Sequence, residues 1–249
     1  MKKIENICYR TFEHERFLLD VYLPDCDAFP VFVYFHGGGI VAGDKTGGKW
    51  FEALCEKGVA VVSANYRLYP EAQYPDFLWD AAAAVSWAYK NMEQYGKVSG
   101  IFVGGSSAGG YLTQMLCFDK RFLSMHKIDA DKVSGYIMDA GQPTVHFNVL
   151  AERGVDSRRV IIDEAAPIYH ICQERSFAHM LILVADNDLE NRYEQTLLLC
   201  STLKHFGHED KFEFKLMENC THCSYTNDFD ENGKSIFAEM VHQFILKHI

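Results

Sequence analysis

The pentapeptide Gly105-Ser106-Ser107-Ala108-Gly109 lies between a β-rich run and a helix-forming run, and this order constrains the fold more than any other feature of the chain. Residues 100–104 predict a short buried strand, and residues 111–118 predict a helix. Small residues on both sides of the serine permit a very tight turn, which exposes the side chain of Ser107. The helix also directs its first backbone N–H groups toward any negative charge that develops there. A glycine- and serine-rich loop is the alternative, and the flanking strand and helix favour the turn.

Composition and charge narrow the class of protein. The chain has 249 residues, of which 48% are hydrophobic, so it can bury a substantial core. Its formal net charge of −10 argues against nucleic acid or an anionic membrane as the main partner. No apolar stretch follows Lys2 and Lys3 to form a secretory signal, and no apolar run is long enough to span a membrane. The eight cysteines are scattered, which favours free thiols over disulfides. We therefore expect a cytoplasmic protein.

Strand and helix patterns alternate along the chain after two initial strands. Strands are expected at residues 4–12, 17–23, 31–35, 59–64, 100–104, 133–138, 179–185 and 211–217. Helices are expected at residues 50–57, 76–95, 111–118, 191–206 and 235–249. The continuous apolar run at 31–35 is typical of a central strand that is covered on both faces. The pattern predicts a single α/β domain over residues 1–249, with a mostly parallel eight-stranded sheet and helices on both faces.

An exposed serine at such a turn needs a base, and an acid that orients the base, before it can attack a substrate. The strand at 179–185 is followed by Asp186, Asp188 and Glu190, at the end of the sheet where the acid is required. Asp188 is preferred because it lies a few residues into the loop. Asp186 and Glu190 stay open, and one of the three acids can cap the following helix. His222 follows the last strand and precedes the last helix, so it is the candidate base.

A glycine-rich loop supplies candidate donors for the negative oxygen of a reaction intermediate. His36-Gly37-Gly38-Gly39 directly follows the apolar strand at 31–35. Glycine has no Cβ, so a ligand oxygen can approach the backbone N–H groups closely. Such a loop pairs with the amide of the residue after the serine, which is Ala108 here. A flexible glycine turn without this role is the alternative.

The segment Cys220-Thr221-His222-Cys223 has the spacing of a metal or redox motif. A zinc site needs a second pair of ligands, and none stands out in the sequence. A thioredoxin-like pair opens a helix early in a βαβ unit, whereas this segment follows a late strand. We therefore expect neither a metal nor an organic cofactor.

Together, these segments resemble the hormone-sensitive-lipase-like family of carboxylesterases. The matching segments are His36 to Asp44 (HGGGIVAGD), Tyr66 to Glu71 (YRLYPE) with Tyr74-Pro75 and Asp80, and Gly105 to Gly110 (GSSAGG). Members usually read YRLAPE and GDSAGG at the second and third segments, so the match is close. The resemblance extends from about residue 15 to the end of the chain.

The resemblance implies an α/β-hydrolase fold and a role for each candidate residue. Ser107 is implied as the nucleophile, His222 as the base and Asp188 as the group that orients it. Gly38, Gly39 and Ala108 are implied as the amides of the oxyanion hole, with Gly37 shaping the loop.

Two departures from the family pattern concern the surroundings of the serine. Ser106 replaces the usual aspartate before the nucleophile, which alters local hydrogen bonding more than chemistry. About thirty strand-like residues stand where family members commonly carry a helical cap. The insertion at about 142–178 is then the candidate lid, and it is short. Its segments 145–147 (VHF) and 168–170 (IYH) either face the substrate or pack as a loop. A small or partly open acyl pocket follows, as in compact bacterial feruloyl- and acetyl-esterase relatives.

The sequence therefore predicts a serine carboxylesterase that acts through an acyl-enzyme on short-chain or small aryl and alkyl esters. Its expected partner is a small-molecule ester rather than nucleic acid or a membrane. An amide, formamide or peptide hydrolase of the same fold, similar to an arylformamidase, uses the same three residues and stays open. A non-catalytic ligand receptor is less favoured, because such proteins generally lose one of the three. The sequence assigns no substrate-binding residues and no oligomeric state.

Overall fold

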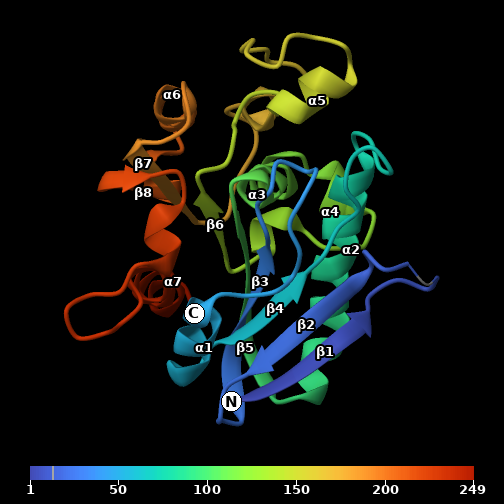
Figure 1. The fold of residues 1–249 in the computed structure, drawn as a ribbon, viewed down its shortest axis with the longest axis vertical. Helices are drawn as coiled ribbons and strands as arrows, with labels where there is room; N and C mark the ends of the chain where they lie inside the picture. The colour runs from blue at the N-terminus through green and yellow to red at the C-terminus, as the bar shows by residue number, and fades with distance from the viewer. Residues whose placement is uncertain (13) are drawn as a thin grey trace.

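The protein is described by a computed structural model over residues 1–12 and 14–249, and its framework is an eight-stranded sheet (Figure 1). The strands are β1 (Lys2–Cys8), β2 (Leu18–Leu23), β3 (Ala28–Phe35), β4 (Ala60–Ala64), β5 (Lys97–Ser106), β6 (Gly135–Asp139), β7 (Met180–Asn187) and β8 (Phe212–Thr221). Their spatial order is β1-β2-β4-β3-β5-β6-β7-β8. β2 pairs antiparallel with β1 and β4, and the other neighbours are parallel. The expected mostly parallel eight-stranded sheet is confirmed.

Helices cover both faces of this sheet. They are α1 (Lys49–Glu56), α2 (Asp76–Asn91), α3 (Ala108–Phe118), α4 (Arg121–Ser124), α5 (Phe147–Glu152), α6 (Arg192–His205) and α7 (Ile236–Lys247). Short 3₁₀ turns lie at 92–94, 130–132, 167–170, 209–211 and 224–227. Within the described part of the chain, no helix is both long and apolar enough to cross a membrane.

Two buried cores lie on opposite faces of the sheet because side chains alternate along each strand. In β3, Val33 joins the core beneath α2, α3 and α6, whereas Phe32 joins the core beneath α1 and α7. In β5, Val103 and Phe102 divide between the two cores in the same way. This explains the continuous apolar run at residues 31–35 of β3, as expected for a strand that is covered on both faces.

The first strand differs from its expected range of 4–12. It begins at Lys2 and ends at Cys8. The chain turns back immediately after that residue, and the backbone N–H of Tyr9 donates to the carbonyl of Phe17 at 3.0 Å. The apolar alternation therefore extended the prediction into a turn that joins β1 to β2.

Several further boundaries differ from the sequence expectation; β8, for example, continues to Thr221 instead of residue 217. α2 ends at Asn91 instead of residue 95, and a 3₁₀ turn occupies 92–94. β5 is longer than the predicted 100–104, because its pairing with β3 runs from Lys97 opposite Ala28 to Gly105 opposite Phe35. The glycines and polar residues at the ends of β5 hide this length in the sequence.

The insertion between β6 and β7 carries α5 and stands above the carboxyl ends of the parallel strands (Figure 1). Several hydrogen bonds anchor it to the body of the protein, and two of them lie next to the serine turn and the glycine-rich loop. The hydroxyl of Tyr111 in α3 donates to the carbonyl of Ala165 at 2.8 Å. The side-chain amide of Asn148 in α5 donates to the carbonyl of Gly39. The segment expected as a short lid thus contacts both the helix after the serine and the glycine-rich loop.

Gly109 sits where the start of α3 crosses the end of β3. A Cβ at this position would lie 1.9 Å from the carbonyl oxygen of Phe35 and 2.8 Å from that of His36. All of these neighbours are backbone atoms, so no side chain can move away to make room. Glycine is therefore required here by close approach of two backbones.

We predict that Gly109→Ala lowers the free energy of unfolding by about 3 kcal/mol or more because of overpacking against backbone. Helix propensity alone would favour alanine by about 1 kcal/mol, so the expected sign is opposite to that of the local preference. Urea denaturation of the purified variant measures the effect. Gly207→Ala is the control: its φ of 80° is strained for alanine but nothing lies within 4 Å, so it should cost only about 1–2 kcal/mol. Equal losses for the two variants would contradict the close-approach argument.

Candidate active site

Ser107 occupies the sharp turn between β5 and α3. Its backbone has φ 57° and ψ −114°, a conformation that costs a non-glycine residue about 1–3 kcal/mol. Its N–H donates to the carbonyl of Asp139 at 2.8 Å, and its carbonyl accepts from the N–H of Tyr111 at 3.0 Å. Ser107 is also the only residue between Ile101 and Gly110 that is not buried. The turn thus holds this serine hydroxyl at the surface of an otherwise buried segment, as the sequence predicts.

The structure connects the side chains of Ser107, His222 and Asp188 in a chain of two hydrogen bonds. His222 Nε2 lies 2.7 Å from Ser107 Oγ, and His222 Nδ1 lies 2.5 Å from Asp188 Oδ1. The Asp188 side chain is fully buried, and its Oδ1 also accepts from the N–H of Leu189 at 2.7 Å. Because a carboxylate can only accept at Nδ1, that nitrogen carries the proton and Nε2 is left to accept from the serine hydroxyl. The arrangement can deprotonate Ser107.

The two alternative acids lie elsewhere. Asp186 accepts hydrogen bonds from the backbone N–H groups of Asn219 at 2.9 Å and Cys220 at 3.2 Å. These backbone hydrogen bonds hold the pKa of Asp186 below its ordinary value. Asp186 therefore holds the end of β8 against the end of β7, directly before His222. Glu190 is exposed and lies beyond the loop position that Asp188 uses.

The glycine-rich loop has backbone geometry that other residues rarely adopt. Gly38 has φ 107° and Gly39 has φ 65°, and a Cβ at Gly38 would lie 2.1 Å from the carbonyl oxygen of Ala42. Among the described residues, the N–H groups of Gly38 and Gly39 find no hydrogen-bond acceptor. Ala108 begins α3, so its N–H belongs to the first turn and lacks an acceptor within the helix. The three predicted amides are thus available to a ligand oxygen.

His36 stabilises this loop from behind. Its Nδ1 lies 2.7 Å from the carbonyl of Gly37, and its Nε2 lies 3.0 Å from Arg16 Nη2. The guanidinium must donate, so Nε2 accepts and Nδ1 carries the proton. The ring stacks on Tyr66 at 4.4 Å, and the Tyr66 hydroxyl donates to the His36 carbonyl at 2.8 Å. Burial lowers the pKa of His36 to about 4, so this ring stays neutral and supports the loop rather than exchanging protons.

Asp139, which sequence reasoning missed, connects the serine turn to the histidine loop. It ends β6 directly opposite Ser106 of β5. Its carboxylate accepts from the hydroxyl of Tyr225, in the turn that follows His222. Among the described residues, its Oδ2 is buried without a hydrogen-bond partner, and burial raises the pKa of Asp139 to about 6. The signal in the sequence is an acid at the end of an apolar strand next to the serine strand.

Ser106, the departure from the family pattern, has a local partner. Its Oγ accepts from the hydroxyl of Tyr34 in β3 at 3.1 Å. The substitution therefore adjusts hydrogen bonding beneath the serine turn, as expected, and leaves Ser107 exposed.

The cysteine-rich segment does not assemble a metal site among the described residues, where no cluster of three or more His, Cys, Asp or Glu side chains could hold an ion. Cys220 instead donates its thiol to the carbonyl of Glu218 at 3.4 Å. The eight cysteines are free.

The two aromatic segments of the insertion mostly pack inward. Val145, His146, Ile168 and His170 are buried, and Tyr169 is exposed to solvent. Phe147 is the exception, because it is half-buried and lines a cavity. Its ring would lie 3.3 Å from a Cβ at Gly39, so it borders the glycine-rich loop.

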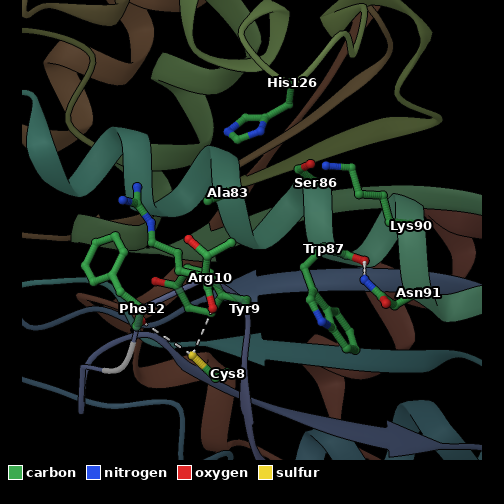
Figure 2. Close-up of a pocket in the computed structure, with 11 residues that line it drawn as sticks. Cys8, Tyr9, Arg10, Phe12, Ala83, Ser86, Trp87, Lys90, Asn91 and His126 are labelled. Atoms are coloured by element: carbon green, nitrogen blue, oxygen red, sulfur yellow. Dashed lines mark hydrogen bonds between the residues drawn. The ribbon is translucent and has the colours of Figure 1, made fainter.

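A larger cavity lies away from these residues. Figure 2 shows this space of about 510 Å³, which is lined by residues 8–12, by one side of α2 and by His126. The thiol of Cys8 donates hydrogen bonds to the carbonyls of Arg10 and Phe12 at one side of this cavity. None of the predicted site residues lines this cavity.

Comparisons with known proteins agree with the motifs. A family model described as BD-FAE matches residues 19–153, more than half of the chain. Carboxylic ester hydrolase LipN of Mycobacterium tuberculosis is 38% identical over 97 residues, which are 36% of this chain and 25% of that protein. The chain therefore spans about a quarter of the length of this relative.

Solved structures resemble the whole chain at low identity. A truncated carbohydrate esterase from gut microbiota superposes with a TM-score of 0.79 at 18% identity, covering 100% of this chain and 96% of that one. Esterase B from Lactobacillus rhamnosis gives a TM-score of 0.78 at 16% identity, covering 98% and 84%. With the sheet order and the turn at Ser107, these likenesses show the α/β-hydrolase fold.

The raised pKa of Asp139 predicts a pH-dependent stability difference. In the unfolded chain this carboxyl ionises near pH 4, whereas burial in the folded state delays ionisation to about pH 6. The folded state is therefore favoured while Asp139 is protonated, below pH 4. This stabilisation is lost as pH rises through 6, because ionising the buried carboxyl costs free energy. Asp139→Asn keeps an acceptor for Tyr225 but cannot ionise.

We predict that the free energy of unfolding of Asp139→Asn, relative to the natural protein, rises by up to about 3 kcal/mol between pH 4 and pH 7. Thermal unfolding of both proteins across this range measures it. Parallel pH profiles for the two proteins would show that Asp139 ionises in the folded state as easily as in water.

Proposed function

Because the chain belongs to the BD-FAE family, we propose that it is a serine carboxylesterase that hydrolyses short-chain or small aryl and alkyl esters. The observation that carries the proposal is the pair of hydrogen bonds that connects Ser107 Oγ through His222 to the buried carboxylate of Asp188. The unoccupied amides of the glycine-rich loop beside these residues support it. The relatives named above are esterases, which agrees with the chemistry.

In this mechanism, Ser107 Oγ attacks the ester carbonyl carbon while His222 Nε2 takes the hydroxyl proton. Asp188 holds the imidazole in the required tautomer and stabilises its positive charge. The negative oxygen of the tetrahedral intermediate accepts hydrogen bonds from Gly38, Gly39 and Ala108, each worth about 3 kcal/mol in such sites. His222 then gives its proton to the leaving alcohol. Water, activated by the same histidine, releases the acid from the acyl-serine.

We further propose that residues 142–178 act as a short lid within a single domain that spans the chain. The hydrogen bond from Asn148 to the carbonyl of Gly39 supports this role, because it joins the segment to the oxyanion loop. The net charge of −10 and the free cysteines support the expected cytoplasmic location and the absence of a nucleic-acid partner.

We expect Ser107→Ala to reduce the hydrolysis of p-nitrophenyl acetate by about 10⁴-fold or more, because the nucleophile is lost. The release of p-nitrophenol measures the rate, and circular dichroism checks that the variant is folded. Ser106→Ala is the matched control and should stay within about tenfold of the natural rate, since it loses only one neutral hydrogen bond. Comparable rates for Ser107→Ala and the natural protein would overturn the mechanism.

The same assay distinguishes an ester hydrolase from an amide hydrolase. An N-formyl aryl amide is compared with the corresponding aryl formate ester at equal concentration. The proposed esterase turns over the ester much faster, whereas preferential cleavage of the amide would assign the alternative activity.

We predict that Asp188→Asn lowers kcat by about 10⁴-fold, because the amide no longer fixes the histidine tautomer. Asp186→Asn should lower kcat far less, since that side chain bonds the backbone of β8 and not the imidazole. Steady-state kinetics of the two variants provide the test. The reverse order of effects would make Asp186 the orienting acid.

A further inference from the structure

A cavity of about 420 Å³ lies between the insertion and the start of α6, near the hydrogen-bonded residues Ser107, His222 and Asp188. Phe147 forms the wall that borders the glycine-rich loop, and Leu189 forms the wall that follows Asp188. Both walls belong to segments at the carboxyl ends of the strands (Figure 1). None of the proposed site residues lines this cavity, but its walls adjoin the glycine-rich loop and Asp188, so we place one end of an ester bound at Ser107 next to it. The inference below rests on the proposed esterase function.

Arginines dominate the charges that line this cavity. Arg158, Arg159 and Arg192 face it, against the single acidic residue Glu190. Arg158 is paired with Asp156 at 2.6 Å on the exposed surface. Arg159 is exposed and forms no ion pair within the described part of the chain. In a chain with a formal net charge of −10, this is a local reversal of sign.

Arg192 is a buried cation that neutral groups hold in place. It is only 4% exposed, and its guanidinium donates to the carbonyl of Ala140 and to Gln142 Oε1. Burial lowers its pKa, and the negative charge of Asp188 opposes that shift. Asp188 is already bonded to His222, so it does not neutralise Arg192 by contact. Arg192 therefore adds positive charge beside the cavity, which the nearby carboxylate of Asp188 offsets in part.

The start of α6 adds to this positive charge. Arg192 is the first residue of this 14-residue helix, whose N-terminal end carries partial positive charge. The side chain of Asn191 also lines the cavity and offers a polar contact, whereas the side-chain amide of Gln142 is already bonded to Val145 and Arg192. An arginine guanidinium such as that of Arg159 binds a carboxylate through two parallel hydrogen bonds.

We propose that this cavity binds a carboxylate that the substrate carries in addition to its ester group. The substrate class is then a half-ester of a dicarboxylic acid, with the charge on the acyl side, or an ester of a hydroxy or phenolic acid, with the charge on the alcohol side. Arg159 makes the direct contact, and Arg192 adds positive charge behind it. Phe147 and Leu189 contact the apolar part that separates the carboxylate from the ester.

Matched pairs of esters test the proposal and identify the side that carries the charge. p-Nitrophenyl butyrate is compared with the mono-p-nitrophenyl ester of glutaric acid for the acyl side. Phenyl acetate is compared with 4-acetoxybenzoate for the alcohol side. We expect kcat/KM to favour the charged member of one pair by about tenfold, and the preference to shrink as salt screens the exposed arginine.

Arg159→Gln should reduce this preference, taken as the ratio of kcat/KM for the charged ester to that for its neutral partner, by about tenfold. Lys97→Gln is the control, because it removes one positive charge from the opposite end of β5 and should leave the ratio unchanged. A preference for the neutral ester in both pairs, or an equal effect of the two variants on the ratio, would overturn the proposal.

Binding to the Ser107→Ala variant separates this inference from the catalytic one. Monomethyl glutarate and methyl butyrate are titrated into the variant, and chemical shifts or calorimetry report the affinity. Tighter binding of the charged ester, lost on adding Arg159→Gln, supports the carboxylate site even if the protein hydrolyses neither ester. Phenyl acetate and 4-acetoxybenzoate are titrated in the same way for the alcohol side, and equal affinity within both pairs refutes the site even if all four esters are hydrolysed.

Discussion

The crossing of two backbones at Gly109 is the constraint on which the rest of the site depends. The start of α3 approaches the end of β3 so closely that no side chain fits between them. This contact fixes the serine turn against the glycine-rich loop, because that loop continues directly from Phe35. Gly37 is part of the same junction, where an added Cβ would lie 3.2 Å from Ser107 Cβ. Ser107 and the proposed amide donors are thus positioned together, by one close contact between backbones.

The proposed acid and base follow the last two strands at one edge of the sheet, and their alignment depends on β7 and β8. These strands pair from Met180 opposite Phe212 to Asn187 opposite Thr221, with an irregularity after Ala185. Asp188 and His222 each follow the last paired residue of their strand. Strand register therefore sets the separation of the two side chains, and the bonds from Asp186 to β8 secure that register where it becomes irregular.

The parts of the site that the sequence predicted are those that local pattern encodes. Glycine spacing, an apolar strand before the serine and a histidine after the last strand identify Ser107, His222 and the loop at 36–39 without tertiary information. Asp139 and Arg192 were missed because their roles arise from strand register and from burial beside groups distant in sequence. Strand ends were misplaced where turns are apolar or strands contain glycine, as in β1 and β5. Hydrophobic alternation reports burial, whereas strand length is set by the partner strand.

The hydrogen bond between Asn148 and Gly39 connects the insertion above the site to the glycine-rich loop. Asn148 belongs to the insertion, and the carbonyl it binds belongs to Gly39, whose amide is a proposed oxyanion donor. Moving the insertion away from the glycine-rich loop would break this bond. The bond is formed in this structure, so the insertion already rests against the loop. If the insertion is the lid we propose, any substrate that forces it upward would also disturb two of the proposed oxyanion donors, and bulky substrates would then lose rate as well as affinity.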